Sequence, residues 1–323
     1  MSVIDQWRRQ AADAKAASGL RRIVLADAGD PRAIEAVRRL NDDGLVEAVL
    51  MERDPSAAVT DKMRSLAEGL QHRLDLTDPL SVAVLMVAAG EADGCVAGAG
   101  APTADVLRIG LRILGVAPGV EAVSSCFFFV LPPTGDQGSS GSGDRRHLVY
   151  GDCGVMPEPT ADQLASVAVA SAATFKQLTG DTPRVAMLSF STKGSAEHPK
   201  IDKVRAATAR VRDLAPELDV DGELQFDAAW DGVVGSSKAP GSSVAGRANV
   251  FVFPDLDSGN IAYKITERLA GARAFGPLLQ GINGVLHDLS RGCSADDIVN
   301  VATIAAVQAA ARPEASARSN DGC

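Results

Sequence analysis

The sequence has few of the residues from which metal sites and disulfide frameworks are built. Only four histidines and five cysteines occur among 323 residues, and no CxxC pair is present. The cysteines lie far apart, at positions 95, 126, 153, 293 and 323. We therefore expect neither a structural zinc site nor a disulfide-stapled fold, and free thiols favour a reducing cytoplasm.

Basic residues are also too few to suggest a general binder of polyanions. Aspartate and glutamate number 41 against 32 lysines and arginines, so the formal net charge is −9 at pH 7. A protein with this charge repels nucleic acid and binds an anion only through local positive groups. Nucleic acid is therefore not an expected partner.

Long apolar runs are missing as well. The longest, residues 82–89 and 126–133, are far shorter than the roughly 18 to 20 apolar residues that cross a bilayer. The first 19 residues include acidic residues and no continuous apolar stretch, so they predict an amphipathic helix and not a secretory signal or a transit peptide. We expect no membrane partner and a cytoplasmic location.

What the chain does contain is ordinary globular composition, with 46% hydrophobic and 23% charged residues over a length of roughly two domains. Short β-rich runs alternate with helical patterns, which favours parallel sheets covered by helices. The expected strands begin at residues 22, 46, 93, 124, 147, 184, 224 and 249, and the expected helices cover 31–44, 79–90, 103–114, 160–178, 203–214, 258–270 and 295–311. The sequence predicts an α/β protein with two domains and mostly parallel sheets.

Two segments do not follow this alternation. Residues 132–146 are rich in glycine and serine and have no apolar anchors, which predicts a hairpin tip. A phosphate-binding loop is disfavoured there, because a strand follows the glycines where such a loop needs a helix. Residues 313–323 form a polar tail that we expect to be disordered.

The segment 288–298 is richer in polar residues than packing requires. Ser290 and Arg291 lie in a glycine turn before the last helix, and Asp297 stands three residues after Ser294. This spacing is that of a capping box, so Asp297 can be a helix-capping carboxylate. The same place suits catalysis, because a carboxylate can accept a proton while a guanidinium holds an anion with two hydrogen bonds. The residues alone leave both interpretations open.

Two further turns between a strand and a helix carry polar residues. Free amides at helix starts favour anions, and the carboxyl ends of strands face the ligand crevice of open α/β sheets. Each turn also has a plain structural interpretation, a helix start with a solvated basic residue. The polar residues are Thr103 and Arg108 in the first turn, and Ser258, Asn260, Tyr263 and Lys264 in the second. Three such turns in one chain favour a shared anion-binding cleft.

A series of ordered motifs carries a family resemblance that covers about residues 22–312. They are ADGCVAGA, TADVLR, PEPTADQLA, LSFSTKGS, GELQFDAA, KAPGSSVAG, PDLDSGNIAYK, GPLLQG and DLSRGCSADDIV. With them the chain resembles the phosphate acetyltransferases, also called phosphotransacetylases. The resemblance implies reversible transfer of acetyl between coenzyme A and phosphate, with coenzyme A as a substrate and without a bound cofactor or metal.

The resemblance also implies how the chain is organised. It implies two α/β domains with an isocitrate/isopropylmalate dehydrogenase-like architecture, an active-site cleft between them, and a homodimer. The first domain would be discontinuous, with residues 1–150 and 277–323, and the second would comprise 151–276.

The same resemblance assigns roles to individual residues. Ser290, Arg291 and Asp297 match the family's catalytic serine, arginine and aspartate, and Arg108 matches a substrate-binding arginine. The remaining expected substrate-binding residues are Thr103, Ser258, Asn260, Tyr263 and Lys264. We expect direct attack of the coenzyme A thiol in a ternary complex, with the aspartate as base. A covalent role for the serine is disfavoured, since no histidine or lysine adjoins it in sequence.

Two departures from the family pattern affect the expected site. The basic stretch ahead of the ADG motif is shortened here, which leaves Arg73 as a weak candidate for a further substrate-binding arginine. Ala101 and Pro102 stand where relatives often have histidine and threonine. The detailed phosphate or acyl pocket is therefore expected to differ.

Alternatives remain at this point. A butyryl or other short acyl preference leaves no signature, because one or two methylenes change affinity by only about 1 to 3 kcal/mol. A non-catalytic module that senses acyl-CoA or acyl phosphate is a second alternative. A related dehydrogenase is disfavoured, because no GxGxxG motif follows a strand.

Overall fold

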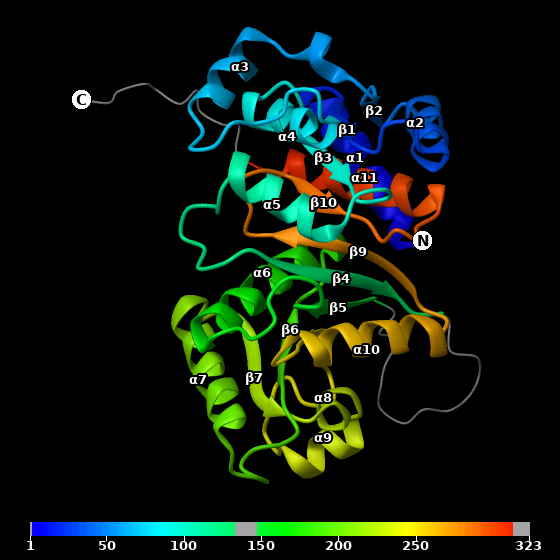
Figure 1. Ribbon diagram of the computed structural model, residues 1–323. Coiled ribbons are helices and arrows are strands. Elements are labelled where there is room, and N and C mark those ends of the chain that lie inside the picture. Colours follow the sequence, from blue (N-terminus) through cyan, green and yellow to red (C-terminus); the bar gives the residue numbers. More distant parts are fainter. Residues whose placement is uncertain (1, 133–146, 313–323) are drawn as a thin grey trace. The chain divides into compact units, whose positions relative to one another are not determined.

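The computed structural model describes residues 2–132 and 147–312, which belong to two compact units (Figure 1). Unit 1 comprises Met1–Gly115 and Ile282–Cys323, and unit 2 comprises Val116–Gly281. The chain therefore divides earlier than the predicted boundary at residue 150. Most of the glycine and serine stretch and the polar tail lie outside the described residues.

Unit 1 is built on a parallel sheet with the strand order β10-β3-β1-β2. Its strands are β1 (Arg21–Leu25), β2 (Val46–Leu50), β3 (Gly94–Ala97) and β10 (Leu286–Asp288). Its helices are α1 (Val3–Ser18), α2 (Pro31–Asp43), η1 (Pro55–Ala58), α3 (Asp61–Glu68), α4 (Pro79–Ala89), α5 (Thr103–Ile113) and α11 (Ala295–Ala310). Helix α11 packs on β3 and β1 and against α1 and α2, while α4 and α5 pack on each other.

The helix boundaries in unit 1 follow from local chemistry. Helix α2 begins where the Asp30 side chain accepts from the Arg32 N–H and Pro31 occupies the first turn, and it ends at Gly44, whose φ is 63°. Helix α4 is apolar on all sides and almost wholly buried. Such a helix has no face for solvent and belongs in the interior.

Unit 2 is built on a mixed sheet with the order β7-β6-β8-β5-β4-β9. Its strands are β4 (Ser124–Val130), β5 (His147–Gly151), β6 (Arg184–Leu188), β7 (Asp219–Leu224), β8 (Val250–Val252) and β9 (Arg273–Gln280). Its helices are α6 (Ala161–Thr179), α7 (Pro199–Leu214), α8 (Phe226–Trp230), α9 (Gly232–Lys238) and α10 (Leu256–Leu269). The sheet is parallel from β7 to β5, but β4 runs antiparallel to both β5 and β9.

This pairing explains where the division of the chain departs from the prediction. Strands β4 and β5, which the predicted boundary placed in the first domain, are central strands of the second sheet. Their alternation with helices in the sequence was correct, but alternation does not say which sheet a strand joins. The antiparallel β4 also makes the second sheet mixed.

The strand predicted from Leu224 is wrong. Residues 226–230 form helix α8, and the strand lies earlier, at Asp219–Leu224. The apolar run favoured the later segment, whereas the real strand carries buried Asp221 and Glu223. Their side chains pair with cations of neighbouring elements, which a sequence pattern does not reveal.

Strand β9 was not predicted, because Pro277 interrupts it. Proline lacks the N–H that a ladder needs and is confined largely to sheet edges. Strand β9 is the edge strand next to β4, which accommodates the proline.

Among the described residues, no helix combines the length and the apolar character that crossing a bilayer needs.

Candidate functional site

The carboxyl ends of three parallel strands of unit 1 hold polar side chains at one edge of the sheet. Leu25 pairs with Val96, and Ala97 pairs with Asp288, so the segments after β1, β3 and β10 leave the sheet at the same edge. Ligands of open α/β sheets bind at this edge. The sequence segments around Thr103 and Ser290 are therefore neighbours in unit 1.

The loop after β3 is held by a carboxylate from the segment after β1. Asp27 accepts hydrogen bonds from the Ala99 N–H at 3.1 Å and the Gly100 N–H at 2.8 Å. Gly98 has a φ of 103°, and a Cβ there would lie 2.0 Å from Asp288 Oδ1. Only glycine fits this position, which brings the loop directly against the end of β10.

Arg32, at the start of α2, ties the same loop to the turn that carries the predicted catalytic residues. Its Nη1 donates to the carbonyl oxygens of Arg291 at 2.8 Å and Cys293 at 3.0 Å, and its Nη2 donates to Ala99 O at 2.8 Å. Its Nε and Nη2 also donate to the Asp30 carboxylate. All five N–H groups of the guanidinium are thus used, and the turn is fixed through its backbone.

Ser290 and Arg291 lie exposed in this turn. The Ser290 Oγ accepts a hydrogen bond from the Gly292 N–H at 3.3 Å, and Ser290 O accepts one from the Cys293 N–H at 2.9 Å. Because the backbone is held while the two side chains face outward, both are available to a ligand. Cys293 is buried, which raises the pKa of its thiol to about 11, so it is not an activated nucleophile.

Asp297 is the capping carboxylate that the sequence spacing allowed. Its Oδ2 accepts from the Ser294 N–H and the Ser294 hydroxyl, both at 2.8 Å, and the Asp297 N–H donates to Ser294 Oγ at 3.2 Å. Within the described part of the chain, Oδ1 makes no hydrogen bond. The cap therefore occupies one oxygen and leaves the other for a proton, so the two interpretations of Asp297 are compatible.

Thr103 lies beside this turn, at the first residue of α5. Its Oγ1 is 2.5 Å from Asp288 Oδ2, and Asp288 is two residues before Ser290. Helix α5 has Pro102 at its N-cap and no side-chain cap, so its first amides are not occupied by a capping side chain. This is the arrangement that favours an anion at a helix start.

Two predicted substrate-binding arginines are not brought to this turn by any contact among the described residues. Arg108, on α5, forms an ion pair with Asp105 at 2.8 Å, and its side chain is 66% exposed. The backbone oxygen of Arg73 accepts from Arg112 Nη2 at 2.6 Å. Arg112 is nine residues after Thr103, which is about 13 Å along a helix, so Arg73 is anchored near the other end of α5.

The predicted residues of unit 2 lie on α10, whose start differs from the prediction. The helix begins at Leu256 with Asp255 as its cap, and the Ser258 hydroxyl donates to the Asp255 side chain at 2.5 Å and to its backbone oxygen at 2.9 Å. Ser258 is therefore already used within the cap. A Cβ on Gly259 would lie 2.3 Å from Asp152 O, so this glycine lets α10 approach the segment after β5.

Three other side chains of α10 form a connected row. Asn260 Nδ2 donates to Cys153 O at 3.0 Å, and Lys264 Nζ donates to Asn260 Oδ1 at 2.6 Å. The Tyr263 ring stacks on Phe127 with a centroid separation of 4.0 Å. The Lys264 ammonium is exposed at the end of this row, and it can meet an anion.

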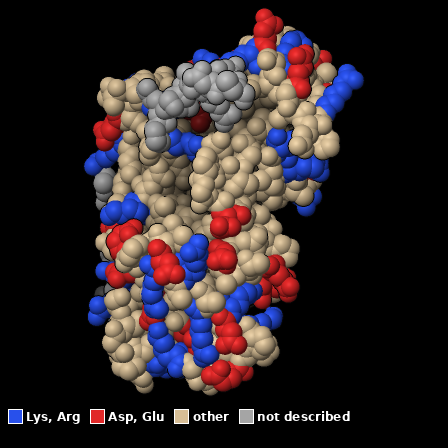
Figure 2. Space-filling model, turned by 90° about the vertical axis from the view of Figure 1, so that its left-hand side faces the viewer, with Lys and Arg blue, Asp and Glu red and all other residues tan. Residues whose placement is uncertain are grey.

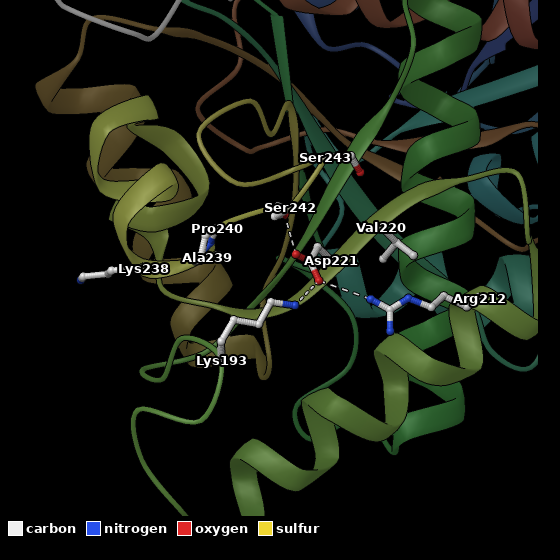
Figure 3. Close-up of a pocket in the computed structure, with 10 residues that line it drawn as sticks. Lys193, Arg212, Val220, Asp221, Lys238, Ala239, Pro240, Ser242 and Ser243 are labelled. Carbon is white, nitrogen blue, oxygen red and sulfur yellow. Dashed lines mark hydrogen bonds and ion pairs between the residues drawn. The ribbon is translucent and has the colours of Figure 1, made fainter.

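Unit 2 also has a hollow lined by Lys193, Arg212 and Asp221 together with the loop after α9 (Figure 3). Figure 3 shows Lys193 and Arg212 pointing at Asp221, whereas Lys238 points away from it. Both cations pair with the Asp221 carboxylate, and Lys238 pairs with Asp227. The hollow is thus an ion-pair network whose cations already have partners.

Sequence reasoning missed Arg32, Asp27 and Asp288 as parts of this site. The available signal was their position, since Asp27 and Asp288 stand where strands end, at the edge where ligands bind. Over residues 2–132 and 147–312, no group of three histidine, cysteine, aspartate or glutamate side chains could hold a metal ion.

Comparisons with known proteins agree with the motifs. Residues 60–306 match the family described as phosphate acetyl/butaryl transferase. A phosphate acetyltransferase of Paracoccus denitrificans is 46% identical over 308 residues, covering 89% of this chain and 95% of the relative. A phosphate acetyltransferase of Acetivibrio thermocellus is 44% identical over 324 residues, covering 91% of this chain and 96% of the relative.

A solved structure is similar over nearly the whole chain. A phosphotransacetylase from Streptococcus pyogenes has a TM-score of 0.83 and 38% identity, covering 96% of this chain and 99% of that one. The matched fold and the matched sequence thus agree. The chain belongs to the phosphate acetyl/butaryl transferase family.

Proposed function

We propose that this protein is a phosphate acetyltransferase, an acyltransferase that interconverts acetyl-CoA plus phosphate with coenzyme A plus acetyl phosphate. The observation that carries the proposal is identity of 44% and 46%, over about nine tenths of the chain, to proteins named phosphate acetyltransferase. The geometry supports it, because the Ser290 turn and the start of α5 meet at the ligand-binding edge of unit 1.

We propose direct attack of the coenzyme A thiol on the acetyl carbon, with Asp297 as the base. The S–C bond forms, the bond from the acetyl carbon to the phosphate oxygen breaks, the thiol proton passes to Asp297, and phosphate leaves with the bonding electrons. An ordinary aspartate is a weak base toward a thiol, so proton transfer accompanies the attack. The Oδ1 atom, outside the cap, receives the proton.

Arg291 and Ser290 stabilise the negative charge that develops during acetyl transfer. The exposed guanidinium of Arg291 neutralises the phosphate or the carbonyl oxyanion, and the Ser290 hydroxyl donates to the oxygen of the tetrahedral centre. Arg32 holds both through the backbone of their turn. Arg291→Lys, which keeps the charge and loses the fork, should therefore stay severely impaired.

Thr103 and Arg108 are the proposed substrate-binding residues of unit 1, with Arg73 a weaker candidate. Those of unit 2 are Asn260, Tyr263 and Lys264, and Ser258 contributes by shaping the cap. That both sets act on the same substrate molecule remains a prediction, as does the isocitrate/isopropylmalate dehydrogenase-like architecture. Coenzyme A is a substrate here and no bound cofactor is proposed.

We also propose that the protein is a cytoplasmic homodimer. The exposed residues Ile261, Ile265 and Leu269 recur every four positions along α10, so they form one apolar stripe that a second copy can cover. The four described cysteines form no disulfide, which suits a reducing compartment. Size-exclusion chromatography with light scattering tests the dimer, and a monomeric mass contradicts it.

Nucleic acid is not among the proposed partners. On the face in Figure 2, basic and acidic side chains are intermixed over unit 2. Several ion pairs join such side chains in unit 2, for example Arg210 with Asp162 and Arg205 with Asp202. Intermixed charge and a net charge of −9 disfavour binding of a polyanion such as nucleic acid.

One assay tests the activity and the acyl preference together. The purified chain is incubated with coenzyme A and either acetyl or butyryl phosphate, and the thioester absorbance is followed. We expect faster turnover of acetyl phosphate. Faster turnover of butyryl phosphate would assign a butyryltransferase, and binding of acyl-CoA without turnover would assign a sensing module.

A further inference from the structure

Asp288 is a buried carboxyl group that the proposed reaction does not use. It ends β10, its exposed fraction is 0%, and its Oδ2 lies 2.5 Å from Thr103 Oγ1. Its Oδ1 is buried against Gly98 and has no hydrogen-bond partner among the described residues. The Leu289 N–H is close to the carboxyl group but not in hydrogen-bonding geometry with Oδ1. Among the described residues, the Asp288 carboxyl group is thus hydrogen-bonded to the site through Thr103.

No cation compensates a negative charge on Asp288 in the described structure. The titratable group that faces it is the Asp27 carboxylate, of the same sign, while β3 and the buried residues of α11 are uncharged. On α5, which also packs on β10, Arg108 is exposed and paired with Asp105, and Arg112 donates to Arg73 O. Arg32 uses all its donors elsewhere, and His287, on the alternate face of β10, contacts Gln308. A buried carboxyl group in such surroundings favours its neutral form. Burial raises the pKa of Asp288 to about 7.

The charge of Asp288 decides what the Thr103 hydroxyl can offer a ligand. A hydroxyl has one proton and two lone pairs. If Asp288 is ionised, Thr103 must donate to it and presents only lone pairs outward. If Asp288 is protonated on Oδ2, it donates to Thr103 Oγ1, and the hydroxyl proton is free for an anion. Anions are held by donors and repelled by lone pairs.

We propose that Asp288 is a positioning residue which, in its protonated form, donates to Thr103 Oγ1 and so turns the Thr103 hydroxyl proton toward the phosphoryl group of the substrate. The uncapped start of α5 and the half-buried position of Thr103 place this hydroxyl where an anion can bind. The role toward the phosphoryl group rests on the proposed acetyltransferase function. The protonation state of Asp288 is independent of that function.

The protonation state is tested first, by infrared difference spectroscopy on the full chain. The wild type should show the carbonyl stretch of a protonated carboxyl group at pH 6, lost with a midpoint near pH 7, and Asp288→Asn should lack that band. Spectra that do not differ between the two proteins in this region would overturn the proposal, whether or not the protein makes acetyl-CoA.

The effect on binding is tested by the KM for acetyl phosphate between pH 6 and pH 8.5. The amide of Asp288→Asn donates to Thr103 at every pH, so it mimics the protonated carboxyl group. The ratio of wild-type to variant KM should be near one at pH 6 and should rise about tenfold by pH 8.5, as one hydrogen bond to a charged group is lost. A ratio that stays constant with pH indicates a purely structural Asp288 and overturns the proposal.

Variants of Thr103 give a second test of the proposal, in which Asp288 is unchanged. Thr103→Val removes the hydroxyl, so its KM should be raised at pH 6 and should lose the pH dependence, while Thr103→Ser should keep it. A Thr103→Val enzyme with the wild-type pH dependence contradicts the mechanism. If no protein forms acetyl-CoA, the proposed function fails while the infrared result still decides the state of Asp288.

Discussion

Glu223 in unit 2 and Asp288 in unit 1 are both buried carboxyl groups near the ends of strands, but only Glu223 has a cation beside it. Arg205 donates to its two oxygens at 2.9 Å and 3.1 Å, and the Gly194 N–H donates at 2.9 Å. Burial alone raises the pKa of Glu223, but these hydrogen bonds outweigh it and lower the pKa to about 2. Asp288 has one hydroxyl and an acidic neighbour, and its pKa rises to about 7.

The difference teaches that burial does not by itself set the charge of a carboxyl group. Glu223 is ionised at neutral pH and joins β7 to α7, so it serves stability. Asp288 can change its charge near neutral pH beside the proposed reaction centre, so it can serve chemistry. Perturbed groups of this second kind are typical of functional sites. The four predictions below test the contrast, from the largest expected effect to the smallest.

Arg205→Met should destabilise the protein most. It leaves the buried Glu223 carboxylate without its cation, and a buried charge that has lost its partner is destabilising. Urea denaturation followed by circular dichroism measures the loss. A loss below about 1 kcal/mol would show that Glu223 is hydrated, and the contrast between the two carboxyl groups would then disappear.

Asp288→Asn should have the opposite effect at high pH. A raised pKa means that the folded wild type holds a proton that the unfolded chain releases above about pH 4, so its stability falls as pH rises from about 4 to 7. The variant does not have this loss. It should be more stable than the wild type by about 4 kcal/mol at most at pH 8, with the gain vanishing near pH 4. Urea denaturation at several pH values measures it, and a difference that does not vary with pH would contradict the raised pKa.

Asp297→Asn should lower kcat by about a hundredfold or more, because the amide cannot accept the thiol proton. The melting temperature should move little, since the amide oxygen can keep the bonds from Ser294. Turnover and thermal melting are measured on the same sample. Turnover within threefold of the wild type would leave Asp297 with the cap alone.

Arg210→Met is the matched control for Arg205 and should change little. Arg210 lies on the same helix, but its ion pair with Asp162, at 3.3 Å, is exposed. Exposed pairs contribute about 0–1 kcal/mol. By urea denaturation, the free energy of unfolding of the variant should therefore lie within about 0.5 kcal/mol of the wild type. A loss as large as that of Arg205→Met would show that the burial of Glu223 does not explain the effect at Arg205.

The sequence supported most helices and the family, since periodic apolar residues, capping residues and ordered motifs are local signals. It failed at Leu224, where an apolar run indicated a strand, and at β9, where Pro277 hid one. Local composition and capping spacing singled out the segment 288–298, whereas the roles of Ser290, Arg291 and Asp297 came from the resemblance to the family and stay predictions. It missed Arg32, whose role consists of bonds to backbone atoms of segments distant in the chain.

The sequence by itself determined the α/β alternation, the absence of clustered metal-ligating motifs and the candidate catalytic turn, because each depends on residues near one another in the chain. Only the tertiary structure decided which sheet β4 and β5 join, that the cap at Ser294 uses one oxygen of Asp297, and that Asp288 is buried without a cation. The physical reason is the range of the forces. Helix caps and turns act over a few residues, whereas strand pairing and the electrostatic environment of a buried carboxyl group depend on residues brought together from distant parts of the chain.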